Sequence, residues 1–264
     1  MDWLLLLKIV LIVIGGIVGF VLFCVILGFL LGLFTGRKKE YDTDSGFYRF
    51  VLNSMTGLVL FFTRAKIKVK GLSLPEKGRF LIVGNHRSNW DPIIAWYKFR
   101  KHRISYVSKP SNFKVPCYGR VVRRCCFLPI DRGSARNSVK TFDRCAELIK
   151  NDVVSFGIYP EGTRSKTLKL LRFHNGVFKI AQKAHVPIVV VCTVGTENIK
   201  NNFPWKRTKV ILDVLEIIPA DRVAEMTTAE IGAEVRQKLG EALIGYGEQP
   251  FEETEETPEP ETQA

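Results

Sequence analysis

The sequence predicts an α/β domain built on a single central mixed sheet of about seven strands flanked by helices, with an N-terminal membrane-anchoring helix or helical hairpin. Short β-branched runs bounded by turn residues alternate with stretches in which apolar residues recur at helical spacing. Before them, the 26 residues from Ile9 to Phe34 contain no charge and no polar amide. The chain has 264 residues, of which 46% are hydrophobic, so it is not a collagen, a disulfide mini-protein or a wholly disordered chain.

The N-terminal apolar segment is long enough to cross a bilayer. As a helix it would reach about 39 Å, against a hydrocarbon core of roughly 30 Å. It is too long for a cleavable signal peptide, and the basic residues Arg37, Lys38 and Lys39 follow it. Because only Lys8 precedes it, the positive-inside rule places the following domain in the cytoplasm, beside the cell membrane or an equivalent membrane.

Gly15 and Gly16 leave a second geometry open for this segment. The helix could break there, or pair with the apolar stretch from 47 to 62 as a hairpin in one leaflet. A buried helix of a soluble protein is a third possibility. We assign residues 1–62 to a membrane anchor and interfacial helical segment.

Residues 63–246 are predicted to form the folded domain, and residues 247–264 an acidic disordered tail that cannot bury a core. The predicted strands are Ile67–Val69, Phe80–Val83, Ile104–Val107, Phe127–Ile130, Val153–Tyr159, Pro187–Val194 and Val210–Ile217. Helical spacing predicts helices around Val139–Ile149 and Val177–Ala184. Thr227 and Glu230 form a capping-box pattern that begins a last helix, which runs to about Ile244.

Charge is distributed unevenly along the chain. The formal net charge is +13, yet residues 248–264 hold seven glutamates and no base, whereas residues 37–247 hold 38 basic and 18 acidic side chains, a net of +20. A strongly cationic domain suits a partner that bears phosphate: nucleic acid, an anionic membrane or a phosphorylated metabolite.

A histidine and a carboxylate follow the strand Phe80–Val83 directly, in the segment Asn85-His86-Arg87-Ser88-Asn89-Trp90-Asp91. Strand carboxyl ends are where α/β domains usually collect their sites. His86 can take a proton from an attacking hydroxyl, and Asp91 can accept the second ring N–H and stabilise the imidazolium. This requires His86 in the loop and Asp91 at the start of the next helix, which Pro92 at a first helical position favours. Alternatively, Asp91 is only an N-cap and His86 a surface residue.

Three further strand ends carry bases. The segment Tyr159-Pro160-Glu161-Gly162-Thr163-Arg164-Ser165 suits close backbone approach to an oxyanion, with Arg164 able to fork onto phosphate. Arg132 and Lys109 each follow another predicted strand. Singly such charges are usually solvated, but their recurrence at strand ends indicates convergence on one anionic ligand.

Several enzyme signatures are absent. The chain has no GxSxG, GxGxxG, GxxxxGK[ST] or HExxH sequence, which removes the usual marks of serine hydrolases, dinucleotide enzymes, P-loop ATPases and zincins. The six cysteines form no CxxC pair and no histidine lies at metal-ligand spacing, so we expect reduced thiols and no metal site.

Taken in order, these segments resemble the glycerophospholipid acyltransferase family, most closely the 1-acyl-sn-glycerol-3-phosphate acyltransferases. The NHxxxxD box matches Asn85, His86 and Asp91. The other three family motifs match residues 127–132, 159–165, where tyrosine replaces phenylalanine, and 186–191. Cys126 stands where the family usually has glycine and Val190 where it usually has proline, and these departures bear on loop shape and on acyl or acceptor preference.

The resemblance implies the family's fold and its reaction. A fatty acyl group would pass from acyl-CoA or acyl carrier protein to the sn-2 hydroxyl of 1-acyl-sn-glycerol-3-phosphate, a lysophospholipid, forming phosphatidic acid in phospholipid biosynthesis without a metal, a cofactor or a covalent acyl-enzyme. It further implies that His86 is the general base, that Asp91 orients it, that Glu161, Gly162 and Thr163 help position the acceptor, and that Arg164, Arg132 and Lys109 bind the acceptor phosphate.

Two other functions stay open at this point. The acceptor could be glycerol-3-phosphate or another lysophospholipid. A membrane-anchored basic binding protein without turnover could use Trp90, Trp96 and Trp205 as contacts. Core or membrane-interface positions suit these residues better, and the binding protein leaves the ordered motifs unexplained, so we expect a membrane partner and no nucleic acid.

Overall fold

The computed structural model describes residues 3–33, 35–36, 39–116 and 118–251. Seven strands form one sheet in the order β1-β7-β6-β2-β5-β3-β4. They are β1 (Ala65–Gly71), β2 (Leu81–Gly84), β3 (Ile104–Ser108), β4 (Leu128–Pro129), β5 (Ser155–Ile158), β6 (Ile188–Val194) and β7 (Thr208–Ile218). Neighbouring strands are parallel except β6 and β7, which are antiparallel. The predicted single mixed sheet is confirmed.

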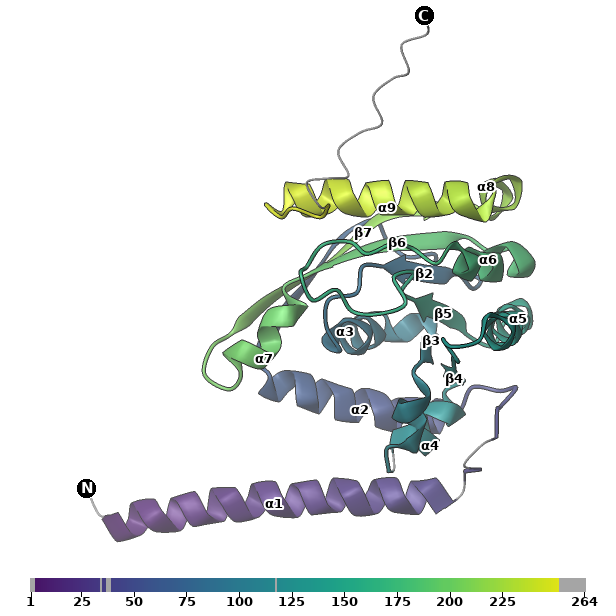
Figure 1. The fold of residues 1–264 in the computed structure, drawn as a ribbon. Helices are drawn as coiled ribbons and strands as arrows, with labels where there is room; N and C mark the ends of the chain where they lie inside the picture. Colours follow the sequence, from purple (N-terminus) through teal and green to yellow (C-terminus); the bar gives the residue numbers. More distant parts are fainter. Residues whose placement is uncertain (1–2, 34, 37–38, 117, 252–264) are drawn as a thin grey trace, which may run out of the picture.

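Helices cover both faces of this sheet (Figure 1). On one face lie α5 (Ala135–Lys150), α6 (Lys179–Ala184), α8 (Ala220–Glu225) and α9 (Thr228–Gly245), and on the other α2 (Gly46–Phe62), α3 (Trp90–Lys98) and α4 (Tyr118–Arg124). The short α7 (Ile199–Asn202) precedes β7. The predicted capping box is confirmed, because Thr227 and Glu230 bond each other's backbone N–H at the start of α9.

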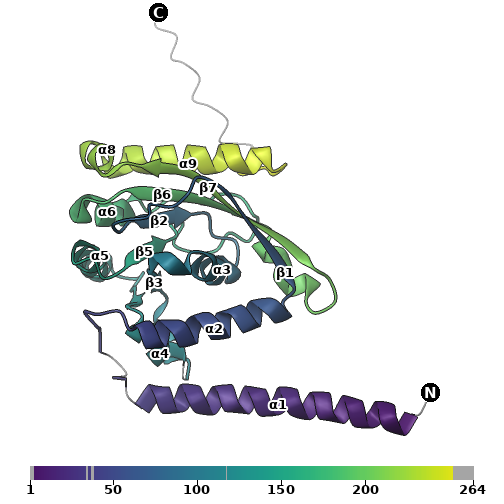
Figure 2. The ribbon, with the colours of Figure 1, turned by 180° about the vertical axis from the view of Figure 1, so that it is seen from behind.

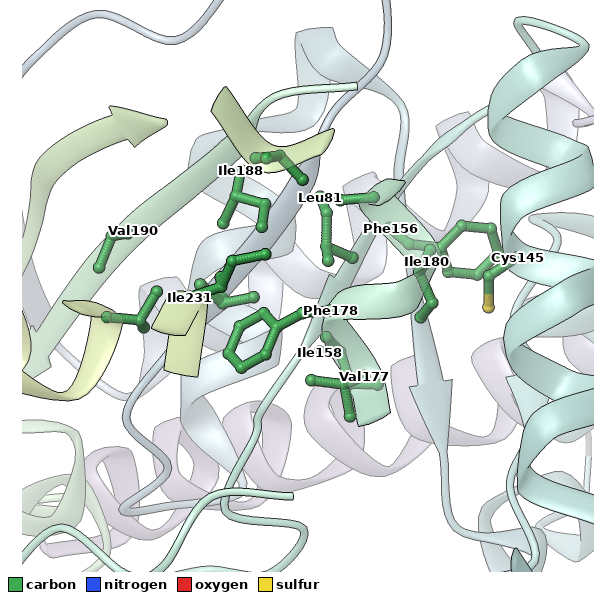
Figure 3. Packing of buried hydrophobic residues seen from close by; sticks show 14 of the residues in the cluster. Leu81, Cys145, Phe156, Ile158, Val177, Phe178, Ile180, Ile188, Val190 and Ile231 are labelled. Atoms are coloured by element: carbon green, nitrogen blue, oxygen red, sulfur yellow. The ribbon is translucent and has the colours of Figure 1, made fainter. Parts of the chain in front are cut away.

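The hydrophobic core lies in two layers, one on each face. In the first, Phe178 and Ile180 from the α6 region, Cys145 from α5 and Ile231 from α9 surround the β2 and β5 side chains (Figure 3). In the second, Trp96 of α3 and residues of α2 and α4 cover the opposite face. The central strands β2 and β5 are buried along their whole length, which matches their continuous apolar sequence and fixes the strand ends where polar residues follow.

The N-terminal helix α1 (Trp3–Leu33) lies below the domain, on the side of α2 and far from α9 (Figures 1 and 2). Its C-terminal end is tied to the domain by the Arg120 guanidinium, which donates to the Gly32 carbonyl at 2.5 Å. Among the described residues, no helix meets the length and apolarity needed to cross a membrane. The membrane anchor therefore stays a prediction.

The first residues of the predicted disordered tail contact the domain. The Pro250 carbonyl accepts a hydrogen bond from Leu170 N at 2.7 Å, and the Glu248 carboxylate pairs with Arg87. The described residues 248–251 thus lie against the domain, a placement that composition does not reveal because it depends on a carboxylate that meets a buried guanidinium. The remainder of the tail, 252–264, lies outside the described residues.

Gly157 in β5 should tolerate no side chain. A Cβ added there would stand 2.3 Å from Cε1 of the Tyr106 ring, and relieving such overpacking costs typically about 1–3 kcal/mol. We expect Gly157→Ala to lower the free energy of unfolding by that amount in chemical denaturation. Gly176→Ala is the control, since a Cβ there meets nothing within 4 Å. Equal stability of both variants would contradict tight packing around Tyr106.

Candidate active site

The candidate residues lie at one edge of the sheet, where parallel strands end. His86 follows β2, Glu161 and Arg164 follow β5, Lys109 follows β3, and Arg132 follows β4. The expected strand-end placement is confirmed for all four loops. Because β2, β5, β3 and β4 are consecutive in the sheet, the loops form a row rather than a ring.

Asn85 fastens the start of the histidine loop to the neighbouring strand. Its side-chain amide donates to the Thr193 carbonyl at 2.9 Å, and its side-chain carbonyl accepts from Thr193 N at 2.8 Å. The pair is buried, so both backbone groups of Thr193 depend on Asn85 for a partner. This contact holds the residue before His86 in place.

His86 and Asp91 form the hydrogen-bonded pair that the spacing predicted. His86 Nδ1 lies 2.8 Å from Asp91 Oδ2, and the Asp91 side chain is fully buried in the first turn of α3. The same oxygen accepts from Arg87 N and Ser88 N, each at 2.7 Å. An ionised carboxylate can only accept, so Nδ1 carries the proton and Nε2 keeps its lone pair. Among the described residues, none hydrogen-bonds Nε2, and the side chain is 15% exposed.

Asp91 is therefore more than a helix cap. The N-cap of α3 is Asn89, and Asp91 stands at the second helical position with its carboxylate turned back to the preceding loop. The other carboxylate oxygen, Oδ1, accepts from the buried Thr196 hydroxyl. Thr196 was missed in the sequence, where its only signal is a position just beyond the end of β6.

Two tyrosine rings fix the plane of the His86 imidazole. The Tyr159 ring stacks on it with centroids 4.2 Å apart and planes 16° apart, and Tyr106 lies beyond Tyr159 at 6.2 Å. Burial raises the pKa of the Tyr159 phenol well above its ordinary value, so the ring stays neutral beside the histidine. Tyr159 stands where the family motif has phenylalanine, and it supplies the same flat surface.

The Glu161 carboxylate holds loops together. Its two oxygens accept from His86 N at 2.6 Å and from Leu171 N at 3.0 Å, and the residue is 3% exposed. Burial raises the pKa of Glu161 to about 7, against the lowering effect of these two backbone donors. Gly162 follows with φ of +67°, and a Cβ there would come within 2.9 Å of the His174 ring. The loop thus requires glycine at this position.

The bases expected to bind phosphate lie at different distances from His86. Arg164 and Thr163 are exposed on the loop after β5, whose next residue, Ser165, donates its N–H to the His86 carbonyl at 2.8 Å. Lys109 and Arg132 follow strands two and three places from β2. With about 4.8 Å between strands, their backbones start roughly 10 and 14 Å away. The structure brings Arg164 to the histidine loop but gives Lys109 and Arg132 no described contact with it.

The two departures from the family motifs have local structural consequences. Cys126 has φ of +60°, in the left-handed region where glycine is unstrained, so here a buried cysteine occupies a glycine backbone conformation. Val190 sits beside the register shift in the β6–β7 pairing.

Among the described residues no cluster of three or more histidine, cysteine or acidic side chains could hold a metal ion. A metal-free reaction stays a prediction.

Three comparisons bear on what this site does. Residues 66–194 match the family model described as Acyltransferase. The chain is 28% identical over 221 residues to the 1-acyl-sn-glycerol-3-phosphate acyltransferase of Haemophilus influenzae, covering 81% of this chain and 88% of that protein. It is 29% identical over 168 residues to the protein of the same name from Escherichia coli, and the match covers 62% of this chain and 68% of that protein. The crystal structure of the 1-acyl-sn-glycerophosphate acyltransferase from Thermotoga maritima matches with a TM-score of 0.63 at 20% identity. The match covers 77% of this chain and 81% of that protein, and it supports the fold.

The titration of Glu161 should be visible in the stability of the protein. Its pKa is about 7 in the folded state and ordinarily 4.5, so between these values the native state holds a proton that the unfolded chain releases. The free energy of unfolding should therefore fall as pH rises from about 4.5 to about 7, by up to about 3 kcal/mol. Glu161→Gln should remove this slope in denaturation curves measured across that range. The exposed Glu147→Gln should keep it, and equal slopes in all three proteins would contradict the raised pKa.

Proposed function

We propose, from the match of residues 66–194 to the acyltransferase family model, that this chain transfers a fatty acyl group to the sn-2 hydroxyl of 1-acyl-sn-glycerol-3-phosphate, forming phosphatidic acid. The donor is a thioester, either acyl-CoA or acyl carrier protein. The observation that carries the proposal is the His86–Asp91 pair, which leaves Nε2 unpaired at the edge where the other motif residues collect.

The geometry supports a direct transfer with His86 as general base. Nε2 takes the proton of the acceptor hydroxyl while the hydroxyl oxygen attacks the thioester carbonyl. The resulting imidazolium is stabilised by Asp91 Oδ2 at 2.8 Å from Nδ1. When the carbon–sulfur bond breaks, the proton passes from His86 to the leaving thiolate, so the enzyme ends in its starting state. No covalent acyl-enzyme is needed.

Arg164 is the cationic residue best placed to bind the acceptor phosphate. Its loop neighbour Ser165 donates its N–H to the His86 carbonyl, so the backbone of Arg164 lies close to His86. A guanidinium can fork onto two phosphate oxygens, and the Thr163 hydroxyl can donate a further bond. Lys109 and Arg132 extend the cationic row toward the far edge, where they could meet a phosphate that lies further from the reacting hydroxyl.

The acceptor is amphiphilic, and the side of the protein bearing α1 and α2 suits a membrane surface. The side chains from Trp3 to Gly16 of α1 are all exposed. On α2, the exposed fractions of Phe61 and Phe62 are 76% and 54%. Near the end of α2 lies the loop before β7 (Figures 1 and 2), where Trp205 is 84% exposed and Arg64 donates to its carbonyl at 3.3 Å. Aromatic rings beside bases are typical of interfaces with anionic lipid.

The proposed reaction and base can be tested in one assay. Detergent-purified protein is supplied with labelled acyl-CoA or acyl carrier protein and, separately, with 1-acyl-glycerol-3-phosphate, glycerol-3-phosphate and lysophosphatidylcholine. We expect phosphatidic acid from the first acceptor, and His86→Ala should lower kcat by at least about 10²-fold, the contribution typical of a general base.

The matched control is His185→Asn, which removes an exposed histidine whose φ of +54° asparagine tolerates. It should retain turnover. Transfer only to another acceptor would change the substrate and keep the mechanism. Near-normal turnover by folded His86→Ala would overturn the mechanism, and no transfer from either donor to any acceptor would overturn the proposed function.

Trp205 should enter the lipid when the protein binds vesicles. The contribution of Trp205 to the fluorescence is the difference between the wild type and Trp205→Phe. In vesicles that contain anionic lipid and brominated acyl chains, bromine should quench this contribution. The buried Trp96, 4% exposed, supplies the control, because its contribution should not be quenched. Equal quenching of the two contributions, or of neither, would contradict this membrane-facing surface.

A further inference from the structure

Arg87, the residue after His86, is a buried cation. Its side chain is 1% exposed, and it meets three separate parts of the chain. The guanidinium donates to the Leu168 carbonyl at 3.3 Å and lies 3.7 Å from the Glu197 carboxylate. Its principal partner is Glu248, which it contacts with both terminal nitrogens, one of them at 2.9 Å from Oε1. A buried guanidinium requires such a partner, because an unpaired buried charge is strongly destabilising.

Glu248 belongs to a short segment, residues 246–251, which we call the C-terminal strap. It is fastened at several points. The Tyr246 hydroxyl donates to Asp213 at 2.5 Å, the Pro250 carbonyl accepts from Leu170 N at 2.7 Å, and the Phe251 ring lies 4.7 Å from the Arg236 guanidinium. The strap lies outside the residues that match the family model.

Through Arg87, the strap is connected to both segments that donate hydrogen bonds to Asp91. Arg87 N donates to Asp91 Oδ2, the oxygen that also bonds His86 Nδ1. Glu197, on the other side of Arg87, follows Thr196, whose hydroxyl bonds the second oxygen of Asp91. A shift of the Arg87 side chain would therefore displace the Arg87 backbone N–H that bonds the Asp91 carboxylate.

We propose that Glu248 is a positioning residue for the site: by pairing with Arg87, it fixes the loop from His86 to Asp91 and the neighbouring loop at Leu168–Leu170. This inference rests on the proposed function for its kinetic consequence. Its structural consequence, a loop held in place by the strap, stands independently and can be measured without turnover.

The test compares Glu248→Gln with Glu234→Gln in the full chain. Both remove a partly exposed carboxylate paired with arginine, 23% exposed at Glu248 and 17% at Glu234, but the Glu234 pair with Arg222 involves α8 and α9 only. We expect Glu248→Gln to lower kcat with acyl-CoA and 1-acyl-glycerol-3-phosphate by roughly 10- to 100-fold with little change in acceptor KM, as for a misplaced catalytic group. Glu234→Gln should match the wild type.

Two further readouts separate positioning from loss of folded protein. Unfolding of a fraction of the sample scales kcat equally at every pH, whereas a displaced Asp91 shifts the pH profile of kcat/KM, because it changes the basicity of His86. A chain ending at Phe251 should keep wild-type turnover, and one ending at Gly247 should behave like Glu248→Gln. Wild-type kcat and pH profile in Glu248→Gln would overturn the inference.

If the wild-type protein transfers no acyl group, the proposed function fails and hydrogen exchange decides the inference alone. Backbone amides of residues 86–91 and 168–171 should then exchange faster in Glu248→Gln than in Glu234→Gln. Equal exchange in the two variants would overturn the positioning role, whatever reaction the site performs.

Discussion

The buried carboxylate of Asp91 is the constraint around which the rest of the site is arranged. A charge with no exposed surface needs donors, and these come from His86, Arg87, Ser88 and Thr196. Two segments more than 100 residues apart are thereby brought together at the ends of β2 and β6. Because the carboxylate is occupied by fixed donors, it can hold the imidazole in one tautomer and one orientation.

Support for this pair extends outward through contacts that each use a backbone group. Asn85 pairs with Thr193 of β6, Glu161 accepts from the His86 amide, and Ser165 donates to the His86 carbonyl. The histidine residue is therefore bound through its side chain and through both its backbone polar groups. Rigid placement suits the role proposed for His86, since a general base must lie within hydrogen-bond reach of the proton that it takes.

The proposed base and the candidate phosphate-binding residues lie along the same edge of the sheet. His86 and Arg164 sit on adjacent strand ends, while Lys109 and Arg132 follow strands at the far side. The apolar and aromatic surface of α1, α2 and the Trp205 loop lies on the helical face that carries α2. A ligand with a phosphate and an acyl chain could meet both a cationic edge and an apolar surface in one molecule, which a purely cationic nucleic-acid surface would not require.

The amino-acid sequence alone determined the seven strands, the helices α5, α6 and α9 and the residues that follow the strand ends, because alternation, helical spacing and turn residues are local properties. It also determined the His86–Asp91 pair, since a loop followed by a helix start brings positions five apart within reach. The partners of that pair came only from the tertiary structure: Thr196 on Asp91, Tyr159 on His86, and Glu248 on Arg87. Strand order also decided that Lys109 and Arg132 start two and three strands from β2. These contacts join residues far apart in the chain, and the strand order that creates them depends on how the whole core packs, which no local pattern encodes.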